Sequence, residues 1–176
     1  MNARTMQTDQ YYSTNASVYL AVANESCRSM RDDLQRRVLP KPDGSPGNVL
    51  VFDPDRRSYK DAFITIVFSG MYVDAMLHIL LVKRRGLDVA RALDHATYEK
   101  KMEELGCQNQ DLLTAAARFR TSRREVVHEK AFLDQDSFKV AQDEAESSIA
   151  FVETFNQHFG IQSSAFARST GRSGAT

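Results

Sequence analysis

Apolar residues recur at helical spacing along most of the chain, with one proline-rich interruption. From Tyr12 to Val38 they alternate in steps of three and four, the spacing of one helix face, which predicts a helix over residues 9–38. All four prolines and two glycines then fall within residues 40–54, and such a cluster indicates a loop, here over 39–57. The apolar run 49–52 inside it fits an extended piece or a hairpin arm packed on the helices.

A second long helix is predicted over residues 62–82, which are apolar on nearly every face. Ser58, followed three residues later by Asp61, resembles a capping box at its start. The basic run 83–85 suits its end, where cations favour the negative end of the helix dipole. We therefore expect this segment to be the central helix of a bundle.

Two polar residues in this central helix, Asp74 and His78, bear on whether the helix spans a membrane and whether it binds a metal. The helix is long enough to span a membrane, but an aspartate at mid-bilayer costs about 2.5–3.5 kcal/mol, so we expect a soluble core helix and no membrane. The two residues lie one turn apart and could form half of a metal site. No second carboxylate–histidine pair accompanies them, so we expect a buried hydrogen-bonded pair and no metal.

Three further segments complete the pattern. Residues 88–105 predict a polar helix or a pair of helical turns, and residues 110–131 and 137–159 predict longer amphipathic helices. Glycines at 86, 106 and 160 stand where helix C-caps would sit. We expect an all-α, five-helix up-and-down bundle in a single domain, residues 1–162, followed by a disordered tail over 163–176 that is rich in Ser, Thr, Gly, Ala and Arg.

Composition fits one globular domain. The 176 residues are 42% hydrophobic and 26% charged, and 23 Lys plus Arg balance 23 Asp plus Glu, so any attraction to nucleic acid must come from local clustering. Two cysteines make no disulfide framework: Cys27 lies on an apolar stripe and is expected in the core, whereas Cys107 follows a helix stop and is expected to be accessible. With no signal-peptide pattern at the N-terminus, we expect a cytoplasmic protein.

One segment, residues 118–130, is unusual for a surface helix because it holds five Arg or Lys against two Glu. Arg120, Arg124 and His128 follow one another at steps of four and form a basic strip. Arg123 falls instead on the apolar stripe, where its side chain must reach past the core or meet a partner. From spacing alone, the simpler interpretation of residues 118–130 is a solvated charged face. Two histidines outside this segment, His95 and His158, are expected to be exposed.

The run Arg123-Arg-Glu-Val-Val-His128 resembles the Arg-x4-His motif of the HEPN superfamily (higher eukaryotes and prokaryotes nucleotide-binding). The order of the expected helices over residues 10–160 also resembles the layout of these small helical bundles, many of which are metal-independent ribonucleases. One position departs from the pattern: active members commonly carry Asn, Asp or His after the motif arginine, and this chain carries Arg124.

The resemblance implies RNA cleavage by the 2′-hydroxyl of the ribose, which leaves a cyclic phosphate and needs no cofactor. His128 would transfer the proton, and Arg123 would stabilise the phosphate. Arg124, Arg120 and Lys130 would bind the substrate. An ideal helix separates residues 123 and 128 by 140° but residues 124 and 128 by only 40°, so Arg124 with His128 is the easier pair geometrically.

Family members bring two motifs together, so the resemblance implies a homodimer, with the small residues Ala117 and Ala131 allowing close approach of two motif helices. It further implies a toxin or defence effector with RNA as substrate and an antitoxin or nucleotidyltransferase-like protein as partner. Two alternatives remain open. One is a non-catalytic HEPN-like module that binds RNA, a nucleotide or a protein, which Arg124 favours; the other is a plain interaction bundle.

Overall fold

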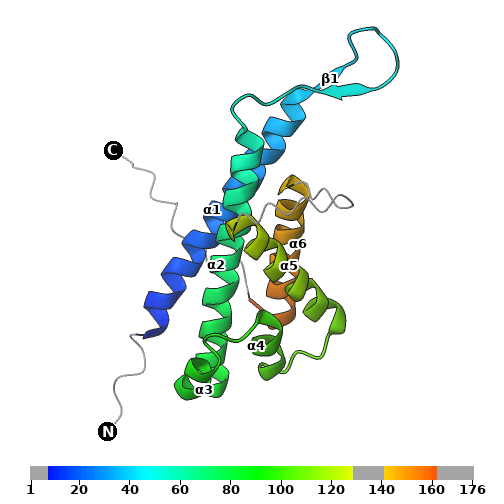
Figure 1. The fold of residues 1–176 in the computed structure, drawn as a ribbon. Helices are drawn as coiled ribbons and strands as arrows, with labels where there is room; N and C mark the ends of the chain where they lie inside the picture. Colours follow the sequence, from blue (N-terminus) through cyan, green and yellow to red (C-terminus); the bar gives the residue numbers. More distant parts are fainter. Residues whose placement is uncertain (1–7, 129–140, 162–176) are drawn as a thin grey trace, which may run out of the picture.

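The computed structural model describes residues 8–128 and 141–161 of the chain, and these form a helical bundle with one small hairpin (Figure 1). The prediction of an all-α fold is confirmed. The predicted tail, 163–176, lies outside the described residues. The elements are α1 (Thr8–Arg37), β1 (Val38–Pro40), β2 (Asn48–Leu50), α2 (Arg57–Arg85), α3 (Leu87–Ala92), α4 (Tyr98–Glu104), α5 (Gln110–His128) and α6 (Ala141–Phe159).

Helix α2 is the centre of the bundle, as its apolar faces predict. It packs against α1, α3, α4, α5 and α6, and Tyr72, Leu77 and Leu81 on it are fully buried. Tyr72 donates a hydrogen bond of 2.6 Å to Asn156 Oδ1 of α6, which satisfies both buried polar groups. Among the described helices, α2 alone has the length and composition to cross a membrane; 56% of its most apolar stretch is buried in the bundle, and core helices share these properties.

The segment expected to form one polar helix is two short helices, the alternative that the sequence left open. Gly86, at φ 94°, ends α2 and leads directly into α3. Thr97 then starts α4 because its side chain accepts a hydrogen bond of 3.3 Å from the backbone N–H of Lys100. The described residues therefore contain six helices rather than five. Cys27 is in the core as predicted; Cys107 is also buried, at 4% exposure, so the expectation that it is accessible is wrong.

The start of α2 differs from the predicted capping box. The helix begins at Arg57, so Ser58 lies within its first turn and not before it. Asp53, from the preceding loop, accepts hydrogen bonds from the backbone N–H of Ser58 at 3.2 Å and from its hydroxyl at 3.4 Å. The carboxylate that caps this helix therefore comes from upstream of it.

The apolar run after the prolines is one arm of a β-hairpin, with Val38 opposite Leu50 and Leu39 opposite Val49. The hairpin extends past the ends of α1 and α2 and does not pack on the bundle as expected (Figure 1). Phe52, just beyond β2, is 82% exposed. The loop thus carries apolar side chains outward instead of adding them to the core.

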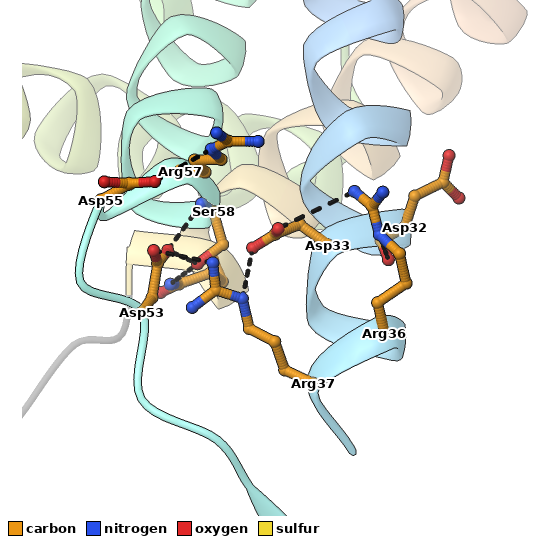
Figure 2. Close-up of polar contacts among 9 residues, drawn as sticks. Asp32, Asp33, Arg36, Arg37, Asp53, Asp55, Arg57 and Ser58 are labelled. Atoms are coloured by element: carbon orange, nitrogen blue, oxygen red, sulfur yellow. Dashed lines mark hydrogen bonds and ion pairs between the residues drawn. The ribbon is translucent and has the colours of Figure 1, made fainter. Parts of the chain in front are cut away.

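Charged residues fix the base of this hairpin where α1 ends and α2 begins (Figure 2). The Arg37 guanidinium lies between two carboxylates, with Nε 2.8 Å from Asp33 Oδ2 and Nη2 2.7 Å from Asp53 Oδ1. Burial would raise the pKa of Asp53, but the hydrogen bonds from Arg37 and Ser58 outweigh it and lower that pKa. One arginine therefore joins α1, the hairpin and the cap of α2.

Candidate functional site on helix α5

The basic segment of α5 is not a free cationic face, because three of its arginines meet carboxylates. Each carboxylate comes from a different helix, so α5 is tied to α6, α4 and α2 in turn along its length. The ion pairs are Arg118 with Glu144 (3.3 Å), Arg120 with Glu99 (3.1 Å) and Arg123 with Asp74 (2.6 Å).

Arg123 lies on the apolar stripe of α5, where the sequence indicated that its charged side chain needs a partner. The structure shows such a partner. Arg123 Nη1 donates to Asp74 Oδ2 at 2.6 Å and to the Tyr98 hydroxyl at 2.5 Å, and that hydroxyl donates to Asp74 at 3.1 Å. The Arg123 side chain is 29% exposed, so it sits at the edge of the core and not inside it. Burial raises the pKa of Tyr98, and the Asp74 carboxylate raises it further, which keeps the phenol protonated.

A glycine in α2 makes room for this arginine. A Cβ built on Gly70 would lie 2.4 Å from Arg123 Cδ and 2.4 Å from Nε. The stem of Arg123 therefore runs directly over the backbone of α2, one turn before Asp74. A side chain at position 70 would therefore require the Arg123 side chain to shift.

Arg120 and Arg123 are brought together at the first turn of α4, because their partners Glu99 and Tyr98 are neighbours in sequence. Arg120 holds Glu99 in a two-pronged contact, with Nε at 3.3 Å and Nη2 at 3.1 Å from the two oxygens. Burial would raise the pKa of Glu99, but the hydrogen bonds from Arg120 lower it. The charge of Arg120, predicted to bind substrate, is thus matched inside the chain.

Glu144 of α6 is a buried carboxylate that the sequence did not single out. It accepts hydrogen bonds from Ser122 at 2.5 Å and from Arg118 at 3.3 Å and is only 7% exposed. A cleft of about 340 Å³ opens beside it between α5 and α6, with Phe119 and Phe151 among its lining residues. In the sequence, the contact of Glu144 with α5 is indicated only by the spacing of Arg118 and Ser122, which lie one turn apart.

Arg124 is exposed, and it forms no ion pair with the residues that the structure describes. His128 is the last described residue of α5, and its side chain lies outside the described part of the chain, as does the whole of Lys130. The regular helix keeps position 128 on the strip of positions 120 and 124, whereas Arg123 faces α2 and α4.

Asp74 and His78 are not buried in the core, contrary to the expectation. Both are half-buried, and Asp74 accepts from Arg123 and Tyr98 across two helix interfaces. Within residues 8–128 and 141–161, no three His, Cys, Asp or Glu side chains gather as metal ligands would. His95 and His158 are exposed as predicted.

Comparison of the chain with protein-family models, with curated proteins and with solved structures finds no match. A proposal for the function therefore depends on the contacts of the side chains described above and on the Arg-x4-His motif of α5.

Proposed function

We propose that the chain is a metal-independent endoribonuclease of the HEPN type, with the site on α5. The observation that carries this proposal is the anchoring of Arg123. Both of its hydrogen bonds, to Asp74 and to Tyr98, use Nη1, and the side chain is 29% exposed. Nε lies over the backbone of Gly70, so Nη2 is the nitrogen that a phosphate oxygen can approach while Nη1 holds the group in place.

The chemistry needs only groups that this helix and the RNA supply. The ribose 2′-oxygen attacks the adjacent phosphorus as His128 takes its proton; a 2′-O–P bond forms, the P–O5′ bond breaks, and the departing 5′-oxygen takes a proton from water. Histidine suits this transfer because its ordinary pKa is close to neutral pH. Arg123 stabilises the extra negative charge on the phosphate, and the exposed Arg124 binds a neighbouring phosphate. A homodimer provides two copies of the motif.

A second candidate is a non-catalytic module that binds RNA, a nucleotide or a protein. The ion pairs favour it: Asp74 and Glu99 match the charges of Arg123 and Arg120, which lowers the attraction of this face for phosphate. Arg124, in the second position of the motif, also favours it.

The test is cleavage of single-stranded RNA by the purified chain in EDTA. The ribonuclease proposal expects products ending in 2′,3′-cyclic phosphate and no cleavage of DNA of the same sequence, which lacks the 2′-hydroxyl. The matched variant is His128→Ala, which should lose cleavage while keeping its helical circular dichroism spectrum. RNA binding without cleavage would reject the ribonuclease and support the second candidate. Absence of both binding and cleavage would contradict an RNA-directed role altogether.

A further inference from the structure

The cleft between α5 and α6 has the size and lining of a small-molecule site. Its volume of about 340 Å³ lies within the range of such sites, about 300–1,000 Å³. Ala115 of α5 and Ala150 of α6 line it, and their small side chains leave the space open. Phe119 and Phe151 are only 4% and 5% exposed and form its floor, with ring centroids 5.0 Å apart. A flat, aromatic ligand suits such a floor.

Glu144 is the buried charged group of this cleft. Its side chain is 8% exposed, whereas the side chain of Arg118, which contacts it at 3.3 Å, is 64% exposed. The carboxylate therefore lies inside the cleft and the guanidinium lies at its mouth. Because Arg118 already balances the charge of Glu144, a ligand that meets Glu144 needs to bring hydrogen-bond donors but no positive charge.

The Glu144 carboxylate can accept more hydrogen bonds than the described side chains donate to it. Oε1 accepts one from Arg118, and Oε2 accepts one from Ser122. A carboxylate has about four acceptor positions and no donor. Each oxygen can therefore accept one further bond, which matches a ligand with two neighbouring N–H donors.

Guanine is the RNA base that presents two such donors. Its Watson–Crick edge carries N1–H beside the N2 amino group, and proteins that bind single-stranded RNA recognise bases on this edge. Adenine and cytosine have a ring nitrogen acceptor at the middle of the same edge, which a carboxylate repels, and uracil has one donor between two carbonyl groups. A carboxylate on an aromatic floor therefore distinguishes guanine from the other three bases.

We propose that the cleft between α5 and α6 binds a guanine base of single-stranded RNA and that Glu144 selects this base. The base lies on Phe119 and Phe151, its N1–H and N2–H groups donate to Glu144, and a phosphate of the same strand meets Arg118 at the mouth. The inference rests on the proposed function for the source of the guanine, which is an RNA strand.

The cleft is close enough to the Arg-x4-His motif for one RNA strand to reach both. Arg118 and position 128 are ten residues apart on α5, about 15 Å along the helix axis. Arg118 and Arg124 are both exposed, so phosphates along this path meet cations. Cleavage then occurs a few nucleotides away from the bound guanine.

An arginine side chain of another protein also carries two neighbouring N–H donors, but the charges of the cleft disfavour it. Arg118 repels a second cation at the mouth and attracts a phosphate. Asp111, the other acidic residue among the described residues that line the cleft, lies seven residues before Arg118, about 10 Å along the axis. It is too far away to compensate a cation held beside Arg118.

Binding of free nucleotides to the full chain tests the site. In isothermal titration calorimetry, guanosine monophosphate should bind at least about tenfold more tightly than inosine monophosphate, which lacks the N2 amino group and leaves one carboxylate oxygen without its donor. Adenosine monophosphate should bind more weakly than either, because its N1 acceptor faces the carboxylate. Equal affinities for the three nucleotides would overturn the proposal. So would the absence of guanosine monophosphate binding at millimolar concentration, or tighter binding of free L-arginine.

Two substitutions connect the binding to the cleft. Glu144→Gln replaces one acceptor oxygen by an amide donor, so it should remove the preference for guanosine over inosine monophosphate. Ala150→Leu fills the cleft from an exposed position and should abolish nucleotide binding while the circular dichroism spectrum stays helical. Gln157→Leu is the matched control, because Gln157 is exposed two turns later on α6 and does not line the cleft. Binding that survives Ala150→Leu would overturn the proposal.

The cleavage assay separates this inference from the proposed function. RNA cleavage by a chain that does not bind guanosine monophosphate would support the ribonuclease and overturn the guanine site. Binding of guanosine monophosphate without RNA cleavage would support the guanine site and reject the ribonuclease.

Discussion

Arg123 of α5 lies across the backbone of Gly70 in α2, close enough that a methyl group on Gly70 would fall 2.4 Å from Arg123 Cδ. A glycine inside a long helix costs about 1 kcal/mol relative to alanine, so its presence here is explained by the side chain that passes over it. Because the same arginine holds Asp74 and Tyr98, this contact joins α2, α4 and α5 at one point.

Gly70→Ala should lower the free energy of unfolding by about 1–3 kcal/mol, because Arg123 must leave its hydrogen-bond partners to avoid the new methyl group. In an Arg123→Ala background the same change should be neutral or stabilising by up to about 1 kcal/mol, since only the gain in helix propensity remains. Urea denaturation of the four proteins measures both effects. Equal effects of Gly70→Ala in the two backgrounds would show that the two residues are not coupled.

Tyr98→Phe should cost about 1–2 kcal/mol of stability, because it removes the hydroxyl that accepts from Arg123 and donates to Asp74 while keeping the buried ring. The ring itself stacks on Phe119 at 6.0 Å between centroids and should stay in place. Tyr59→Phe is the control, because Tyr59 is 45% exposed, and it should change stability by less than about 0.5 kcal/mol. Chemical denaturation that finds equal losses for the two variants would rule out a structural role for the Tyr98 hydroxyl.

If the chain cleaves RNA, His128→Ala should slow single-turnover cleavage by about 10²–10⁴-fold, the usual contribution of a positioned acid or base. Arg124→Ala distinguishes the two possible arginine–histidine pairs. A small effect assigns phosphate stabilisation to Arg123, whereas a loss equal to that of His128→Ala assigns it to Arg124. Cleavage that persists at the wild-type rate in His128→Ala would place the activity at another site or in a contaminant.

Acid should weaken the contact between Glu99 and Arg120. The folded chain lowers the pKa of Glu99, so the unfolded chain takes up the proton first, and the stability from this pair is present above the ordinary glutamate pKa of about 4.3. It is lost as pH falls from there through the lower folded-state value. Thermal unfolding of wild type and Glu99→Gln should differ at pH 7 and converge towards pH 3. A gap that stays constant over this range would contradict the assignment.

The long helices could be predicted from sequence because each buries one regular stripe. Ala23, Cys27 and Met30 lie on the predicted face of α1 and are buried, and the predicted limits of α6 end at the observed Phe159. The break between α3 and α4 was less certain, because a single capping residue, Thr97, marks it in a polar segment. The structure and packing of the loop were ambiguous in the sequence, because an apolar run does not show which part of the protein, if any, covers it.

The site could be predicted only in part. The position of Arg123 on the apolar stripe showed that it needed a partner, but the two partners lie 49 and 25 residues away on other helices, and one sequence does not reveal such pairings. Gly70 was the missed signal, since an interior glycine in an otherwise continuous apolar helix indicates a close approach. The motif predicted α5 as the helix of the candidate site, and tertiary packing determines which of its arginines meet carboxylates.

The pairing of α1 with α2 has a consequence for the order of folding. These helices make the most extensive contact in the bundle and are joined by a hairpin that is itself local in sequence, so their association closes only a short loop. The contacts of α6 with α1 and α2, by contrast, close most of the chain. We expect the folding nucleus to form between the first two helices. In stopped-flow experiments, Met30→Ala should then mainly slow folding, and Phe155→Ala should mainly speed unfolding.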